Sequence, residues 1–231
     1  DTGVSPHNLK LIRRAIAEPY GIILISGPTG SGKSTTLYAM LGEIDRVGLN
    51  EISLEDPVEY NTEGVSQSQV RPEIGYTFAN GLRTALRQDP DVIMVGEIRD
   101  KETAQLAIQA ALTGHLVLST IHTNNAAGVV PRLIDMGVDP YLIAPTLKLA
   151  LAQRLVRRIC PGSGKKVSVA NGIQKMVDDQ FADLPDEFRK VIPTSDHVLF
   201  VEPSPGCSSG TKGRVAVMEG IAVDNEIEQL I

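Results

Sequence analysis

Residues 21–35 read GIILISGPTGSGKST, an apolar run, a glycine-rich loop, and then lysine, serine and threonine. The run at 21–26 is short and wholly apolar before its last residue, which predicts a strand buried on both faces. Residues 27–35 match the phosphate-loop pattern GxxxxGK[ST], and a helix is expected to follow through about Val47. Strand, loop and helix in this order predict a site for a nucleotide.

The residue types in the loop explain this prediction. Glycines let consecutive backbone N–H groups converge on one phosphate, and the following helix directs its positive end there. Lys33 offers a point charge to the β- and γ-phosphates, and Ser34 offers a hydroxyl to Mg²⁺. The alternative, a plain glycine-rich turn, would not need all these features in register. We expect ATP to contact the whole loop: Gly27, Pro28, Thr29, Gly30, Ser31, Gly32, Lys33, Ser34 and Thr35.

Other apolar runs extend this unit into a sheet. Strands alternating with helices predict an α/β fold with a mostly parallel sheet flanked by helices. Further strands are expected at 52–55, 92–95 and 116–121, with a weakly alternating edge strand at 65–70. Helices are expected after Ser5-Pro6, after the phosphate loop, after Thr77, and at 100–113, 124–136 and 140–158.

The composition changes beyond Cys160. Residues 162–172 are polar and glycine-containing, and residues 203–213 are turn-forming throughout. We expect a small inserted module there, after which RVAVMEGIAV at 214–223 returns as a strand. The predicted parts are an ATPase core at 1–160, an inserted module at 161–212, and a C-terminal strand and helix at 213–231.

Acidic residues and a histidine lie at the carboxyl ends of the predicted strands. Ligands of parallel sheets bind beyond the carboxyl ends of the strands, so Glu55, Glu97 and His122 are expected above the phosphate loop. Glu97 is the candidate for orienting Mg²⁺-bound waters, with Gly96 leaving room for them. Glu55 is the candidate for polarising the attacking water.

Two further acids, Asp56 and Glu59, compete with Glu55 for this role. Any of these carboxylates could instead be a solvated loop residue or a helix cap. His122 is the candidate sensor of the γ-phosphate.

The other histidines have different expected roles. His115 lies about 23 Å from His122 at ~3.3 Å of rise per strand residue. Both therefore cannot reach one phosphate within a subunit, and His115 is expected to cap the preceding helix or contact a neighbour. His7 and His197 are expected at the surface.

Arg83 and Arg87 are four residues apart on one predicted helix, opposite its apolar face. Like charges at this spacing cost a few tenths of a kcal/mol unless they meet an anion. They are either a solvated face or catalytic arginines that contact acids or phosphates, including across a subunit boundary. Arg99, next to Glu97, could serve in the same way.

The amino-acid composition limits the kinds of partner and the cellular location that are expected. A formal net charge of −6 over 231 residues, with 4% aromatics and no Trp, argues against a nucleic acid. No apolar run approaches the ~20 residues of a membrane span. Cys160 and Cys207 are the 2 cysteines, so we expect reduced thiols and a cytoplasmic location. The first residue is Asp1 rather than methionine, which we interpret as the start of a fragment.

Taken together, four stretches resemble the motor ATPases of type II secretion and type IV pilus assembly. In that family they correspond to the Walker A loop, the aspartate box, an atypical Walker B motif ending Gly-Glu, and the histidine box. The similarity runs from about Val4 to Arg158 and again from Gly213 onward. The stretches are GPTGSGKST (27–35), ISLEDPVEY (52–60), LRQDPDVIMVGEIRD (86–100) and TGHLVLSTIHTN (113–124).

The resemblance implies a RecA-like P-loop NTPase domain that works as a homo-hexamer. It implies Mg²⁺-dependent ATP hydrolysis that drives an inner-membrane platform protein, and a cytoplasmic location peripheral to that membrane. Lys33 and Ser34 would bind phosphate and metal, and Glu55 would be the catalytic carboxylate. Glu97 would be the Walker B acid, and His122 the histidine-box residue nearest the γ-phosphate.

Assembly motors of this family usually carry an inserted zinc module with two Cys-x-x-Cys pairs. Cys160 and Cys207 fit the two pairs, but Ser163 stands at the partner position of the first. A structural zinc site normally needs four ligands, so we expect degenerate remnants and no zinc, even with help from His197 or an acid. The insertion favours an assembly or secretion motor over a retraction motor.

The family usually has a preceding domain that supplies arginines to the nucleotide. We expect that domain to lie outside this chain, so the fragment should bind ATP but hydrolyse it slowly and assemble poorly. Two alternatives are a nucleic-acid-translocating motor, opposed by the acidic balance, and a catalytically silent nucleotide-binding subunit. The second is opposed by the presence of both Glu55 and Glu97.

Overall fold

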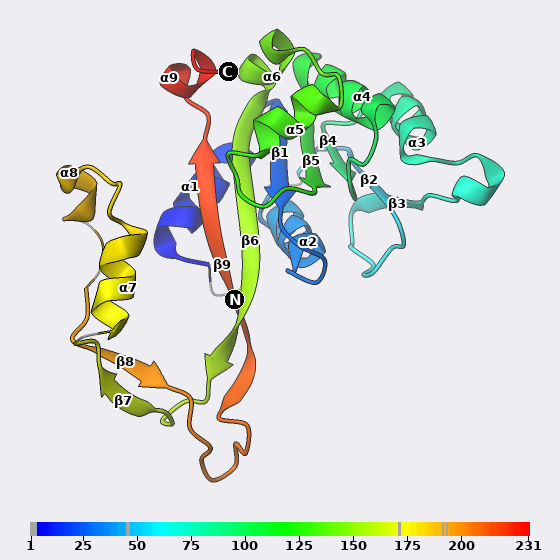
Figure 1. The fold of residues 1–231 in the computed structure, drawn as a ribbon. Coiled ribbons are helices and arrows are strands. Elements are labelled where there is room, and N and C mark those ends of the chain that lie inside the picture. The colour runs from blue at the N-terminus through cyan, green and yellow to red at the C-terminus, as the bar shows by residue number, and fades with distance from the viewer. Residues whose placement is uncertain (1–3, 45–46, 171, 191, 193) are drawn as a thin grey trace. The chain divides into compact units, whose positions relative to one another are not determined.

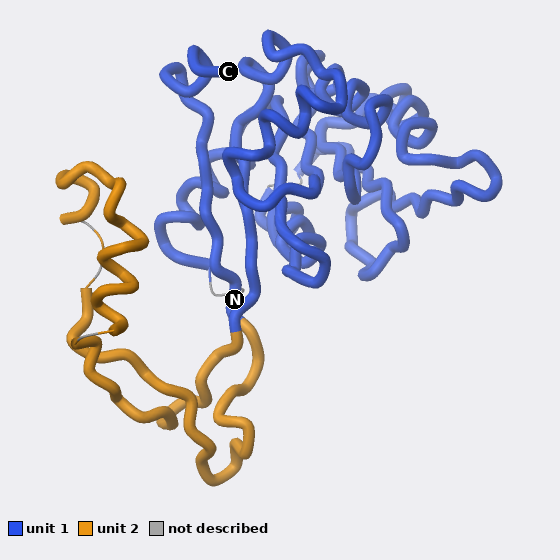
Figure 2. Tube along the Cα trace, viewed as in Figure 1, with its two compact units in different colours: residues 1–156, 215–231 blue, residues 157–214 orange. Residues whose placement is uncertain are grey.

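The computed structural model describes residues 4–44, 47–170, 172–190, 192 and 194–231. The chain divides into two compact units, shown in Figure 2. Unit 1 comprises residues 1–156 and 215–231, and unit 2 comprises residues 157–214.

Unit 1 is built on one sheet, which in the described part of the chain has seven strands in the order β3-β2-β4-β5-β1-β6-β9 (Figure 1). Neighbouring strands from β3 to β6 all pair in parallel. The predicted α/β fold with a mostly parallel sheet is confirmed, and β3 lies at an edge as expected. The strands are β1 (Gly21–Ser26), β2 (Glu51–Glu55), β3 (Val65–Gln69), β4 (Val92–Val95), β5 (Leu116–Ile121), β6 (Leu147–Ile159) and β9 (Thr211–Ala222).

Helices alternate with these strands, and those that follow Ser5, Thr77 and Asp100 begin where the sequence predicts. Ser5, Thr77 and Asp100 each accept a hydrogen bond from the backbone N–H three residues later, which satisfies an orphan donor of the first turn. The helix after the phosphate loop ends at Glu43, and residues 45–46 of its predicted extension lie outside the described residues. The helices of unit 1 are α1 (Pro6–Ile16), α2 (Lys33–Glu43), α3 (Phe78–Ala85), α4 (Lys101–Leu112), α5 (Val129–Asp135), α6 (Pro140–Thr146) and α9 (Asn225–Glu228), with 3-10 turns η1 (Pro72–Ile74) and η2 (Leu86–Gln88).

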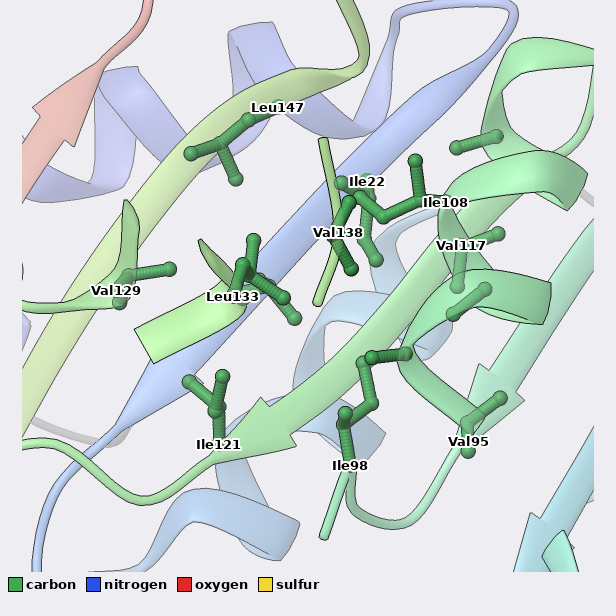
Figure 3. Close-up of a cluster of buried hydrophobic side chains, with 14 of the residues drawn as sticks. Ile22, Val95, Ile98, Ile108, Val117, Ile121, Val129, Leu133, Val138 and Leu147 are labelled. Carbon is green, nitrogen blue, oxygen red and sulfur yellow. The ribbon is translucent and has the colours of Figure 1, made fainter. Parts of the chain in front are cut away.

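The core lies on both faces of the sheet, because successive strand residues point to opposite faces. On one face, strand residues such as Ile22 and Val117 pack with Ile108 of α4 and Leu133 of α5, as Figure 3 shows. On the other face, residues such as Ile23 pack with α1 and α2. Burial on both faces explains why the central strands read as continuous apolar runs.

The predicted helix at 140–158 is wrong for most of its length. Helix α6 ends at Thr146, and residues 147–159 form β6, whose first part pairs with β1. In this part β6 is buried almost continuously, and a fully buried strand cannot be distinguished from a buried helix by periodicity. The predicted helix at 124–136 is shortened to α5 because Gly128 N donates to Asn125 Oδ1 at 2.7 Å in a preceding turn.

In its described residues, unit 2 contains a two-stranded antiparallel sheet and two helices. The side chains of Val169 and Cys160 are among its few buried ones in the described residues. This unit therefore has little core of its own. Its elements are β7 (Lys165–Ser168), β8 (His197–Phe200), α7 (Gly172–Gln180) and α8 (Asp186–Arg189).

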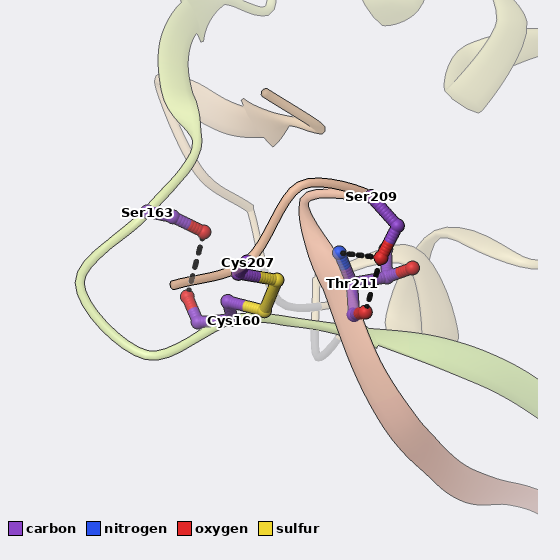
Figure 4. The surroundings of a disulfide bond; sticks show 5 residues. All are labelled: Cys160, Ser163, Cys207, Ser209 and Thr211. Atoms are coloured by element: carbon purple, nitrogen blue, oxygen red, sulfur yellow. Dashed lines mark hydrogen bonds between the residues drawn. A yellow bond between two sulfur atoms is a disulfide. The ribbon is translucent and has the colours of Figure 1, made fainter. Parts of the chain in front are cut away.

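The expectation of two reduced thiols is also wrong, because Cys160 and Cys207 form a disulfide (Figure 4). Strands β6 and β9 are neighbours in the sheet. Cys160, which follows β6, and Cys207, which precedes β9, therefore lie close together. The Cα atoms of the two cysteines are 6.7 Å apart despite a sequence separation of 47. Ser163 stands at the partner position of the first Cys-x-x-Cys pair considered above. Its hydroxyl donates to Cys160 O at 2.9 Å.

The described residues contain neither a metal-ligand cluster nor a membrane-spanning helix. No group of three or more His, Cys, Asp or Glu side chains there could hold a metal ion. None of the described helices is long and apolar enough to cross a membrane.

Candidate nucleotide site

The phosphate loop connects β1 to α2, as predicted. Gly32 caps α2 in the left-handed conformation, with φ of 86°, and Gly27 has φ of 137°. A Cβ at Gly27 would lie 2.4 Å from the backbone O of Gln153 on β6. The glycine at position 27 is therefore required both by its φ angle and by close packing of the loop against β6.

Lys33 is folded back over the loop. Its Nζ donates to Gly27 O at 3.0 Å and to Pro28 O at 3.1 Å. Burial lowers the pKa of Lys33 from its usual value, and the negative charge of Glu97 opposes this shift. The lysine of the loop and the acid that follows β4 therefore act on each other electrostatically.

Glu97 lies between the side chains of Arg99 and His122. Its side chain is 14% exposed, its Oε1 pairs with Nη2 of Arg99, and its Oε2 lies 3.4 Å from Nε2 of His122. The hydrogen bond with Glu97 raises the pKa of Arg99. The structure thus brings together Glu97 and His122, which follow β4 and β5. Both lie at the edge of the sheet formed by the carboxyl ends of the strands, where β1 leads into the phosphate loop.

Gly96 has a packing role. Its N–H donates to Leu54 O at 2.8 Å, and its carbonyl accepts from Thr120 Oγ1 at 2.8 Å. A Cβ at Gly96 would lie 3.2 Å from Leu54 O and 3.5 Å from the ring of Phe78. The missing side chain accommodates these neighbours rather than the waters expected from the sequence.

Glu55 is buried, at 4% exposure, and its carboxyl group accepts three side-chain hydrogen bonds. Ser53 Oγ donates to Oε1 at 2.5 Å and Gln67 Nε2 to the same oxygen at 3.0 Å, while Tyr38 OH donates to Oε2. Burial, followed by the hydrogen bond to Glu55, raises the pKa of Tyr38 to about 12, so the phenol keeps its proton. Donors from α2, β2 and β3 thus fix this carboxyl group.

The two competing acids, Asp56 and Glu59, are exposed loop residues. Sequence reasoning missed Tyr38 and Gln67 as partners of Glu55. A signal for Tyr38 was its position four residues after Ser34, which places both on one side of α2.

The arginine candidates lie in α3 and η2. Arg83 pairs with Glu102 of α4 and donates from Nη1 to Asn80 Oδ1 at 3.0 Å, and Arg87 is exposed in η2. Their assignment as catalytic residues stays a prediction.

The remaining histidines agree with the sequence analysis. His115 Nδ1 lies 2.9 Å from Ala110 O, so the predicted capping of α4 is confirmed. His7 and His197 are exposed, as expected.

The loop and its surroundings fit a magnesium nucleotide. Ser34 is exposed in the first turn of α2, and a hydroxyl with a carboxylate such as Glu97 is a donor set that suits Mg²⁺. Among the described residues, Ser31 Oγ is buried without a hydrogen-bond partner. This hydroxyl lies in the loop where a phosphate would be bound.

A parallel sheet with a phosphate loop after β1 and a glutamate after β4 defines the chain as a RecA-like P-loop NTPase domain. Its particular family follows from its sequence. The chain belongs to the family described as "Type II/IV secretion system protein", whose model matches residues 1–231.

Curated relatives and solved structures agree with this assignment. "Type II secretion system ATPase E" of Vibrio cholerae is 47% identical over 233 residues, covering 99% of this chain and 44% of that protein. "Type II secretion system protein E" of Klebsiella pneumoniae is 58% identical over 159 residues, covering 69% of this chain and 32% of that protein. The chain thus spans less than half the length of these relatives.

Two solved structures share the fold. The pilus retraction motor PilT with bound ADP has a TM-score of 0.61 at 39% identity, covering 69% of this chain and 48% of that one. The ATPase DotB of Legionella pneumophila has a TM-score of 0.63 at 28% identity, covering 99% of this chain and 52% of that one.

Proposed function

We propose that this chain is the ATP-hydrolysing domain of a motor that powers assembly of a type II secretion pseudopilus or a type IV pilus. The observation that carries the proposal is the cluster at one sheet edge. There Lys33 interacts with Glu97, and Glu97 lies 3.4 Å from His122. ATPases and a motor among the relatives support the same activity.

In this proposal, backbone N–H groups of the loop at 27–35, other than Pro28, hold the ATP phosphates. Lys33 leaves the carbonyls of Gly27 and Pro28 and binds the β- and γ-phosphates. Ser34, and Glu97 partly through water, hold Mg²⁺, which neutralises charge on the phosphates when bound. These groups orient the transferred phosphoryl group and stabilise its charge, which supplies most of the rate in such reactions.

Glu55 and His122 complete the proposed site. Glu55 polarises the attacking water, and Tyr38 and Gln67 position its carboxyl group. His122 contacts the γ-phosphate and is held near it by Glu97. Arg83 and Arg87 contact acids or phosphates, including across a subunit boundary.

The setting of the whole protein is also part of the proposal. We infer that a homo-hexamer acts on an inner-membrane platform protein from the cytoplasmic side, with a preceding domain that completes the site. The core at 1–160 and the segment at 213–231 would form the motor, and the module at 161–212 would be an appendage. The fragment alone should then hydrolyse ATP slowly.

Steady-state hydrolysis of Mg²⁺-ATP by the full-length protein tests the function. Glu55→Gln is expected to lower kcat about a hundredfold or more while ATP still binds, and the exposed neighbour Asp56→Asn is the matched control with near-native kcat. Equal losses in both variants, or none in either, contradict the proposed role of Glu55. Stimulation of the wild-type rate by DNA would favour the nucleic-acid motor instead.

A further inference from the structure

Gln153 on β6 is a buried polar residue outside the proposed catalytic groups. Its side chain is 2% exposed, and both ends of its amide are hydrogen-bonded. Oε1 accepts from Thr36 Oγ1 at 2.8 Å, and Nε2 donates to Ser31 O at 2.7 Å. One side chain thus joins β6 to the middle of the phosphate loop and to the first turns of α2.

The loop backbone is fitted closely around this residue. A Cβ at Gly27 would lie 2.4 Å from Gln153 O, and a Cβ at Gly32 would lie 3.0 Å from Gln153 Nε2. Both glycines also have positive φ angles. Gly32, the sixth residue of the phosphate-loop pattern, therefore packs against the side chain of Gln153, whereas Gly27, the first, packs against the backbone oxygen of the same residue.

The hydrogen bond to Ser31 O fixes the direction of one peptide group. In a trans peptide, the C=O of Ser31 and the N–H of Gly32 point in opposite directions. Because Ser31 O is directed toward the Gln153 amide, the N–H of Gly32 is directed away from that amide. An unanchored loop would lose backbone entropy when a phosphate ordered it, which would weaken binding.

We infer that Gln153 is a positioning residue for the nucleotide phosphates. It acts through Ser31 and Thr36 and holds the loop in its binding conformation before the ligand arrives. The inference rests on the proposed binding of ATP at this loop and assigns a new residue to it. Because β6 continues directly into unit 2, the same side chain also links the phosphate loop to the strand that carries the inserted module.

The role requires a donor and an acceptor at once. Methionine has a similar size but donates nothing to Ser31 O. Glutamate can accept from Thr36, but when ionised it places a second acceptor against Ser31 O. When protonated, glutamate again has one donor and one acceptor, so Gln153→Glu should regain the function of the amide at low pH.

The test measures the Kd of Mg²⁺-ATP and of pyrophosphate with the full-length protein. Gln153→Met is expected to raise both values about tenfold, the equivalent of one lost buried hydrogen bond, with a smaller effect on kcat at saturation. Val156→Ala, an exposed residue of the same strand, is the control and should bind like wild type.

A pH profile separates positioning from general structural damage. Burial raises the pKa of a carboxyl group, so Gln153→Glu should bind weakly at about pH 8 and approach wild type at about pH 5.5 when compared at the same pH. Comparing the Kd of the variant with that of wild type at each pH cancels the effect of ATP protonation, which is the same for both proteins. Repulsion between the new charge and the phosphates would give the same profile, but Gln153→Met has no charge and distinguishes the two.

The outcomes distinguish a failure of this inference from a failure of the proposed function. If wild type binds nucleotide and a folded Gln153→Met binds equally well, this inference is overturned and the proposed function stands. If Gln153→Met does not fold, a flat pH profile of Gln153→Glu relative to wild type overturns the inference. If the wild-type protein binds neither ligand, the proposed function fails and the inference fails with it.

Discussion

Oε2 of Glu97 lies 3.4 Å from Nε2 of His122, although the two residues are 25 positions apart. They meet because β4 and β5 pair in parallel, with Val95 opposite Ser119, so both strands finish at the same edge. Strand β1 continues this register, with Ser26 opposite Ile121. The phosphate loop therefore begins at the level where His122 leaves the sheet.

His122 is predicted to act on the reaction rather than on binding. His122→Gln removes the ring that lies beside Glu97, so kcat for ATP hydrolysis should fall about tenfold or more while the Kd of ATP changes little. His115→Gln is the matched control at the opposite end of β5, where the ring bonds Ala110 O. Equal effects of both substitutions on kcat would refute the assignment.

Tyr38 is predicted to position Glu55. Tyr38→Phe removes the phenol that donates to the Glu55 carboxyl group, so stability should fall by about 1.5 kcal/mol and kcat should fall with little change in the Kd of ATP. Tyr60→Phe is the control, because the Tyr60 ring packs edge-on against Tyr38 and the substitution keeps that ring. Stability is measured by urea unfolding. A Tyr38→Phe protein with native kcat would show that the phenol is not needed.

Lys33 should make ATP binding depend on pH in the alkaline range. Burial lowers its pKa in the free protein from the usual value of 10.5, and bound phosphates favour the charged form and raise it again. The contribution of Lys33 to ATP affinity is thus fully present below the lowered pKa of the free protein. It is lost as pH rises from that pKa to the higher pKa of Lys33 in the ATP complex. Titration calorimetry should show weaker binding and proton uptake in this window. Lys33→Met should bind ATP weakly, with no loss of affinity and no proton uptake in this pH window. A wild-type affinity that rises with pH in the window would contradict the prediction.

The disulfide should stabilise unit 2. It closes a loop with a sequence separation of 47, which lowers the entropy of the unfolded segment by the equivalent of about 4 kcal/mol. Reduction, or Cys160→Ser, is therefore expected to accelerate proteolysis within residues 157–214 and to leave residues 4–44 protected. Thiol titration of the unreduced protein provides an independent check. Two titratable thiols would contradict the disulfide.

Local signals in the sequence were sufficient for much of this fold. The pattern at 21–35 predicts β1, the loop and α2 because each segment has its own signature. Ser5, Thr77 and Asp100 predict helix starts because a cap bonds within its own first turn. The rule that parallel strands end at one edge was sufficient to bring Glu97 and His122 together.

The rest depends on contacts between distant segments. Residues 147–159 form a strand because β1 offers a partner, which periodicity does not reveal. Gln153 and Gln67 are ordinary polar residues in the sequence, and only their neighbours give them roles. The pairing of Cys160 with Cys207 likewise follows from the adjacency of β6 and β9, which the count of two cysteines does not reveal.

The central claim is that side chains from separate strands act on one bound nucleotide. Single-turnover hydrolysis of Mg²⁺-ATP by full-length Glu97→Gln, with ATP affinity measured on the same sample, tests it most directly. The account predicts a hydrolysis rate about a hundredfold or more below wild type and an ATP affinity within about threefold of it. A wild-type rate in the Glu97→Gln protein would contradict the claim.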